Sequence, residues 1–117
     1  MSALIALRCA AVLGATGVAF GAFGAHGLKK IISEPDRIQT WDMAARYQLI
    51  HAAALLALSA SARHRPYVAG LWTAGTVMFS GSIYCLVLNR DAFKALGPVT
   101  PLGGMLMIAG WLALLAP

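Results

Sequence analysis

Two histidines in a very apolar chain are the residues best placed to do chemistry. His26 follows the apolar stretch that ends in Phe23-Gly24-Ala25, and His51 closes the polar run Arg46-Tyr47-Gln48. The first lies at the exit of one expected helix and the second about one turn inside the next. We therefore expect the two imidazoles to reach a similar depth on the same side of a membrane, where they could meet.

Three kinds of chemistry are open to such a pair. Two imidazoles on adjacent helices could ligate a haem iron, or, together with Cys85 or Met105, a soft metal ion. Ionisable groups inside a membrane could also mark a proton or substrate path. However, no second notch of small residues would admit a porphyrin, no tight ligand spacing supports a metal, and all four acidic residues fall in expected loops. We expect no cofactor and no metal, and keep as the alternative a small transport, cofactor-binding or metal-binding protein that uses His26 and His51.

A polar clasp between helices is the simpler interpretation of these groups. We expect Arg46 to donate to the carbonyls at the end of the first helix, and Gln48 to bridge to His26 or to the following loop. Interhelical hydrogen bonds in membranes average only about 0.6 kcal/mol. The clasp, formed by His26, Arg46, Gln48 and His51, would therefore fix the register of the helices more than it would stabilise them.

Signatures of soluble enzymes do not appear in the sequence. The spacing Gly21-x-x-Gly24-x-x-Gly27 does not follow a strand, so it does not indicate a dinucleotide site. There is no phosphate loop, nucleophile elbow or pair of catalytic carboxylates. We expect no enzymatic activity.

The composition indicates the elements that must position these residues. Apolar residues make up 60% of the 117 positions and charged residues 11%, against about 25% charged in soluble domains. About 20 apolar residues cross a bilayer core, and four stretches approach this length: residues 4–26, 44–62, 67–88 and 98–116. Backbone groups cannot stay unpaired in lipid, so the spans must be helices. The sequence predicts an all-α fold, a four-helix transmembrane bundle, in one domain over residues 1–117. Because Arg8 lies inside the first stretch and not before it, we expect a retained helix and not a cleaved signal peptide.

The connections differ in length and character. Pro66 and Pro98 are well placed to begin the third and fourth helices. The long connection, residues 27–43, interleaves charges with Ile31, Ile32, Ile38 and Trp41. This mixture predicts an amphipathic segment on the membrane surface, with Trp41 and Tyr47 as interface anchors.

Basic residues gather at one end of the expected bundle. Six Lys and Arg residues lie on the side of the long connection and three on the other: Lys29, Lys30, Arg37, Arg46, Arg90 and Lys94 against Arg8, Arg63 and Arg65. Positive charge favours the cytoplasmic side, so both termini should face outward. The net charge of +5 then predicts anionic lipid headgroups, and not nucleic acid, as the partner.

A regular glycine face predicts close helix packing. Gly14, Gly17, Gly21 and Gly24 recur at spacings of three, four and three in the first helix, and small residues on one face let another backbone approach. The partner is left open: another helix of this chain, a second copy or a larger membrane complex. Gly103 and Gly104 offer a weaker surface, because adjacent glycines point in different directions.

Four ordered motifs resemble one known family over nearly the whole chain. They are Phe20-Gly21-Ala22-Phe23-Gly24-Ala25-His26-Gly27-Leu28, Ala45-Arg46-Tyr47-Gln48-Leu49-Ile50-His51-Ala52, Phe79-Ser80-Gly81-Ser82-Ile83-Tyr84 and Gly97-Pro98-Val99-Thr100-Pro101-Leu102-Gly103-Gly104. Together they resemble the YgdD-like family of small, uncharacterised membrane proteins. The resemblance implies a four-helix protein of the bacterial inner membrane, with relatives in eukaryotes, and implies no reaction. We expect a structural or accessory role, with packing against itself or a larger membrane complex.

Overall fold

The computed structural model describes all of residues 1–117, and its regular elements are all helices, which confirms the all-α prediction. Four long helices are joined by short helical pieces. In chain order these are α1 (Ala3–Ala25), η1 (Leu28–Lys30), α2 (Pro35–Ala60), α3 (Pro66–Leu88), α4 (Arg90–Phe93), η2 (Lys94–Leu96) and α5 (Val99–Ala113). As expected, Pro66 lies in the first turn of α3 and Pro98 immediately precedes α5.

The second long helix starts earlier than the sequence predicted. Glu34 is extended and Pro35 occupies the first turn of α2, a position where the missing proline N–H has no helical partner to lose. The surface segment expected over residues 27–43 is therefore wrong beyond residue 34. Trp41 is consequently not an interface anchor: it is 2% exposed, and its indole Nε1 donates to the Phe20 carbonyl at 2.7 Å.

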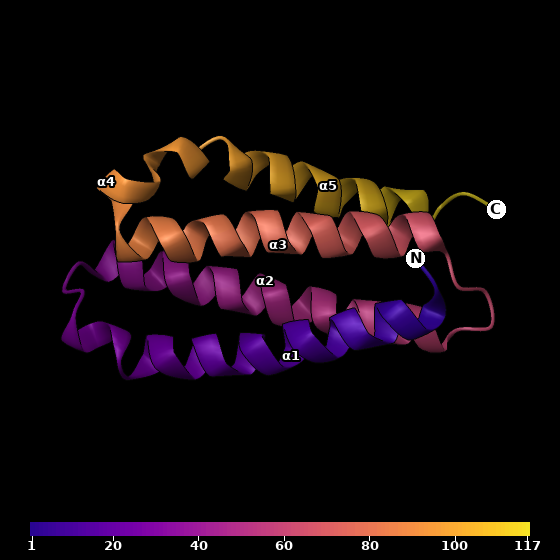
Figure 1. The fold of residues 1–117 in the computed structure, drawn as a ribbon, viewed down its shortest axis with the longest axis horizontal. Helices are drawn as coiled ribbons and strands as arrows, with labels where there is room; N and C mark the ends of the chain where they lie inside the picture. Colours follow the sequence, from indigo (N-terminus) through magenta and orange to yellow (C-terminus); the bar gives the residue numbers. More distant parts are fainter.

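The long helices lie side by side in the order α1, α2, α3, α5 (Figure 1). The arrangement is 47 Å long, 26 Å wide and 19 Å thick. α1 packs mainly on α2, α2 on α3, and α3 on α5, without a comparable contact between α5 and α1. The structure is thus an open row of four long helices, and the four-helix transmembrane bundle that we expected is not confirmed.

Only some of these helices have the length and composition of a membrane span. Two are long and apolar enough: Ala3–Lys30, which joins α1 to η1, and Pro66–Leu88. A third is obtained if Arg90–Leu96 and Val99–Ala113, which are bent by 47° relative to each other, count as one span. The first turns of α2 carry Asp36, Arg37 and Asp42, so their hydropathy is low.

The core has two apolar parts with polar groups between them. The part nearest the chain termini contains Ala6, Ala10, Leu55, Leu58, Val68, Ala69 and Trp72, and the opposite part contains Leu28, Ile32, Trp41, Ala44, Ile83, Tyr84 and Val87. Between them lie four buried polar side chains, which we call the polar layer: Gln48, His51, Thr76 and Ser80.

The glycine face of α1 lies against α2 of the same chain. A Cβ added at Gly17 would lie 2.9 Å from Leu49 Cδ2, and one at Gly24 would lie 2.6 Å from Trp41 Cδ1. The nearest neighbours at Gly14 and Gly21 are the Cβ atoms of Ala52 and Ala45, both at 3.9 Å. All four glycines therefore face α2, two in tight contact and two with ordinary spacing.

A closer approach occurs between α3 and α5. A Cβ added at Gly103 would lie 2.4 Å from the Phe79 nitrogen and 2.8 Å from the Gly75 carbonyl oxygen. A Cβ at Gly75 would lie 2.8 Å from both the Gly103 oxygen and the Met107 nitrogen. The two backbones touch, so no side chain can move to make room.

Arg65 ties the connection between α2 and α3 to the end of α5. Its Nη1 donates to the carbonyls of Ala113, Leu114 and Ala116 at 3.3, 3.1 and 2.7 Å. The last carbonyls of a helix lack partners in a following turn, and this guanidinium supplies a donor to them.

Candidate functional site

The two histidines of the expected clasp do not meet. His26 is exposed just beyond α1, whereas His51 is buried inside α2. On α1, the residue level with His51 is Gly14, which lies against the neighbouring Ala52. His26 follows Gly14 by twelve residues, so the two histidines differ in position along the helices by about 18 Å. The prediction that the imidazoles reach the same depth is wrong, because α2 begins at Pro35 and places His51 several turns inside the helix.

The other expected members of the clasp also take separate positions. Arg46 Nη2 donates to Asp42 Oδ2 at 2.5 Å on the exposed side of α2, and has no hydrogen bond to the carbonyls of α1. An exposed ion pair of this kind contributes about 0 to 1 kcal/mol. Arg46 is therefore not part of an interhelical site.

Gln48 joins three helices, although its partners are not those that the sequence indicated. Its Nε2 donates to the Leu13 carbonyl at 2.9 Å and to Thr16 Oγ1 at 2.7 Å. Its Oε1 accepts from the Tyr84 hydroxyl at 2.7 Å. One buried amide thus connects α1, α2 and α3, and none of its contacts involves His26.

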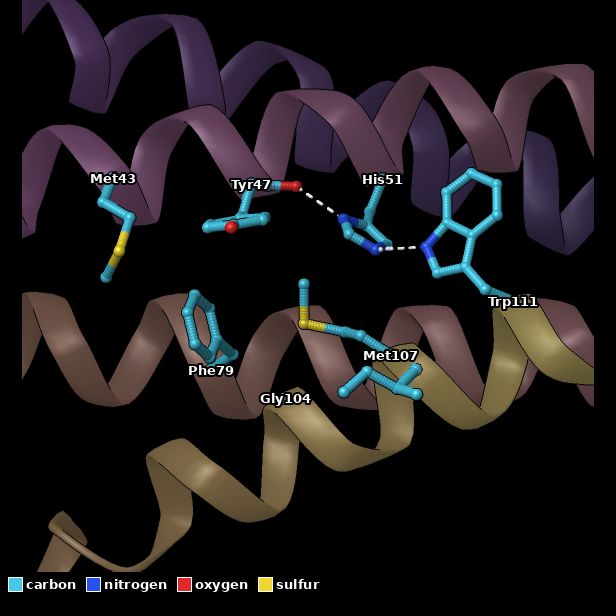
Figure 2. Close-up of a pocket in the computed structure, with 8 residues that line it drawn as sticks. Met43, Tyr47, His51, Phe79, Gly104, Met107 and Trp111 are labelled. Carbon is cyan, nitrogen blue, oxygen red and sulfur yellow. Dashed lines mark hydrogen bonds between the residues drawn. The ribbon is translucent and has the colours of Figure 1, made fainter.

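His51 uses both ring nitrogens within the chain (Figure 2). Trp111 Nε1 donates to His51 Nε2 at 2.9 Å, and His51 Nδ1 lies 2.8 Å from the Tyr47 carbonyl oxygen. An indole N–H can only donate and a carbonyl can only accept. The ring is therefore neutral with its proton on Nδ1, and an iron or other metal ion at Nε2 would have to displace Trp111.

A pocket of about 400 Å³ opens beside His51. Figure 2 shows that it lies between α2 and α5, with Phe79 of α3 projecting into it. Its lining is mainly apolar and consists of Met43, Tyr47, His51, Phe79, Gly104, Met107, Ile108 and Trp111. Cys85 and Met105 do not line it, and Met105 is 64% exposed. The metal-ligand set suggested by the sequence is therefore not assembled here.

Most residues of this pocket were not predicted from the sequence. Met43, Tyr47 and His51 are four residues apart on α2, and Gly104, Ile108 and Trp111 recur at steps of four and three on α5. Residues three and four apart share a helix face, so each of the two faces could be predicted from the sequence. The sequence did not indicate that the two faces lie on either side of α3.

Comparison with known proteins places the chain in a family. Residues 20–104 match the family described as Protein of unknown function (DUF423). A UPF0382 membrane protein of Schizosaccharomyces pombe is 37% identical over 114 residues, covering 91% of this chain and 94% of that protein. The UPF0382 inner membrane protein YgdD of Escherichia coli K12 is 39% identical over 122 residues, covering 98% of this chain and 89% of YgdD.

A UPF0382 membrane protein of Staphylococcus aureus is 41% identical over 102 residues, covering 84% of this chain and 81% of that protein. No solved structure matches the chain. The relatives are named as membrane proteins, in bacteria and in a eukaryote, which agrees with the apolar helices of the structure. The chain is a small membrane protein and belongs to the uncharacterised DUF423/UPF0382 family, the family of YgdD that its motifs resemble.

Proposed function

We propose that this protein has a structural or accessory role in the membrane, without enzymatic activity, and packs against a second copy or a larger membrane complex. The observation that carries the proposal is that side chains of the polar layer form hydrogen bonds between helices. Gln48 and His51 bond to other helices, and Ser80 donates to the Ala44 carbonyl at 2.7 Å. These groups hold helices together, whereas a catalytic group must be free to contact a substrate. Within this region only the Thr76 hydroxyl and the Trp72 indole, both on α3, have no hydrogen-bond partner.

We further propose that α1, α2, α3 and α5 all cross the inner (plasma) membrane. α2 would cross with its charged first turns among the headgroups, where Asp42 and Arg46 remain solvated. The E. coli relative is named an inner membrane protein, which supports this location. The excess of Lys and Arg at the end that holds η1 and α4 supports a cytoplasmic position for that end, in contact with anionic lipids.

The outer face of α5 is the surface that we propose for a partner helix. The glycine face of α1 is already occupied by α2, so it cannot serve a second protein. α5 presents exposed apolar side chains that do not line the pocket beside His51: Leu102, Met105 and Leu112. We assign the contact with a partner to these side chains.

Photo-crosslinking in intact membranes tests the proposal. A photoreactive amino acid is placed at Met105 on the outer face of α5, and a matched control at Val18, which is also exposed but lies on α1. We expect a discrete higher-mass product from position 105 and little from position 18. A protein that stays monomeric in native nanodiscs, without a crosslink at either position, would contradict the proposed packing. A Soret band or stoichiometric metal in the purified protein would contradict the structural role.

A further inference from the structure

A second pocket continues the pocket beside His51 toward α4. It has a volume of about 350 Å³ and shares Met43 with the first. Its lining is Arg37, Thr40, Met43, Ile83, Leu86, Val87, Arg90 and Thr100. The two pockets therefore adjoin at the Met43 side chain.

The spacing of the lining residues supports a single groove. On α2 the lining positions are 37, 40, 43, 47 and 51, and on α5 they include 100, 104, 107, 108 and 111. Steps of three and four keep residues on one helix face. On α3, Phe79 and Ile83 follow the same rule. One groove, which we call the α2/α5 groove, therefore runs between α2 and α5 with α3 as its floor.

The two ends of this groove differ in chemistry. At the α4 end lie two guanidinium groups and two hydroxyls, those of Arg37, Arg90, Thr40 and Thr100. Arg37 is engaged with Glu34 at 3.2 Å and with the Val87 carbonyl, whereas Arg90 is exposed and forms no ion pair. From Met43 onward the lining is apolar and aromatic, down to the His51–Trp111 pair.

The length of the groove fits one leaflet of a membrane. From Arg37 to His51 the helix rises about 21 Å, against about 20 to 22 Å for one leaflet with its headgroup region. Between Met43 and His51 the apolar and aromatic lining surrounds a volume of about 400 Å³. This lining suits a hydrocarbon chain, and the exposed guanidinium of Arg90 at the α4 end suits an anionic headgroup.

We propose that the α2/α5 groove binds an anionic glycerophospholipid, with its phosphate at Arg90 and an acyl chain lying along Met43, Phe79 and Met107 toward Trp111. Basic pockets between membrane helices are known to recognise such headgroups. The proposal rests on the proposed function only for its membrane placement. It does not require a second protein to bind.

Lipid binding to the full chain, measured by native mass spectrometry after delipidation, tests this directly. The probes are dioleoyl phosphatidylglycerol, dioleoyl phosphatidylcholine and free oleate. We expect phosphatidylglycerol to bind about fivefold more tightly than phosphatidylcholine, the effect of one basic residue near an anionic lipid. Equal binding of the two lipids would overturn the anionic preference, and tighter binding of oleate than of phosphatidylglycerol would overturn the assignment to a phospholipid.

Three variants locate the binding site. Arg90→Gln should reduce phosphatidylglycerol binding to the level of phosphatidylcholine, whereas Arg63→Gln, which removes a charge at the opposite end, should change nothing. Gly104→Leu should weaken the binding of both lipids by filling the apolar part of the groove, and Gly104→Ala serves in its place if the leucine variant does not fold.

Equal effects of Arg90→Gln and Arg63→Gln on lipid binding, or unchanged lipid binding to the folded Gly104 variant, would overturn the proposal. Loss of a dimer in that variant, with no bound lipid in the parent protein, would assign the groove to a second copy. Lipid binding is measured on the single chain, whereas the crosslink at Met105 reports contact with a second protein. Absence of lipid binding and absence of the crosslink are therefore separate results.

Discussion

Two helix pairs in this protein use glycine in different ways. Between α1 and α2, the tight glycines Gly17 and Gly24 face the side chains of Leu49 and Trp41. Between α3 and α5, Gly75 and Gly103 bring the backbones themselves together. In the first pair a neighbouring side chain can shift to accept a methyl group, whereas in the second a whole helix must move.

The two helix pairs also differ in where their hydrogen bonds lie. Hydrogen bonds from Gln48 and Trp41 to α1 lie within the length of the α1–α2 contact. Between α3 and α5, Ser82 and Thr100 bond near one end, and Arg65 reaches the last carbonyls at the other. Shape therefore dominates the middle of the α3–α5 contact. This contact also holds α5 on α3 and leaves the groove toward α2 open.

The largest effect should come from a methyl group at the α3–α5 contact. We expect Gly103→Ala to lower the free energy of unfolding by about 1 to 3 kcal/mol, the usual cost of overpacking, because the new Cβ meets backbone at 2.4 Å. Gly104→Ala is the matched control, since its Cβ meets Phe79 Cδ1 at 3.6 Å. Unfolding in mixed micelles measures both, and equal stability of the two variants would remove the distinction between the helix pairs.

The next effect concerns the amide that links α1, α2 and α3. Gln48→Leu should cost about 1 to 2 kcal/mol, because it removes three hydrogen bonds that average about 0.6 kcal/mol in membrane proteins. Tyr84→Phe removes one of the three and should cost about 0.6 kcal/mol. The same unfolding assay applies. If Tyr84→Phe costs as much as Gln48→Leu, the contacts to Leu13 and Thr16 contribute nothing.

A smaller effect is expected where a side chain can yield. Gly17→Ala should cost about 1 kcal/mol, the low end for overpacking, because the end of the Leu49 side chain, 2.9 Å from the new Cβ, can move away from the methyl group. Gly21→Ala, with 3.9 Å to the Ala45 Cβ, should cost nothing. The unfolding assay reports on both variants. A loss at Gly17 as large as that at Gly103 would show that side-chain and backbone contacts are equally rigid.

The smallest effect is expected across the open groove. Trp111→Phe removes the hydrogen bond to His51 and should cost about 0.6 kcal/mol, with a change in the nitrogen chemical shift of His51 Nε2. Tyr47→Phe is the control, because His51 bonds to the Tyr47 backbone carbonyl and not to its hydroxyl. An unchanged Nε2 shift in the Trp111 variant would contradict the hydrogen bond.

What the sequence predicted correctly is local and periodic. The helices predicted from apolar stretches about 20 residues long, at residues 4–26 and 67–88, have nearly the same bounds as α1 and α3 in the structure. The four glycines of α1 lie on one face, as their spacing required. Such patterns depend only on the geometry of a single helix. The error over α2 was also local, because Glu34-Pro35 is a helix-start signal that the charged surroundings obscured.

What could not be predicted depends on pairing between distant helices. Gly75 and Gly103 are single positions on two helices, and no repeat connects them. The bond from Trp111 to His51 joins residues 60 positions apart. The prediction that His26 and His51 are neighbours depended on a start of α2 near residue 44, whereas the helix begins at Pro35. A shift of that start by nine residues moves a side chain by about 14 Å along the axis.

The contact of Arg65 with the end of α5 bears on how the chain is assembled during synthesis. Its three carbonyl partners follow it by 48 to 51 residues. At about 5 to 20 residues per second, they emerge from the ribosome about 2 to 10 s after the arginine. During that interval α1, α2 and α3 can pair, while the guanidinium stays hydrated at the membrane surface. α5 is then the last helix to dock, and the open side of the row lets it do so without displacing the others.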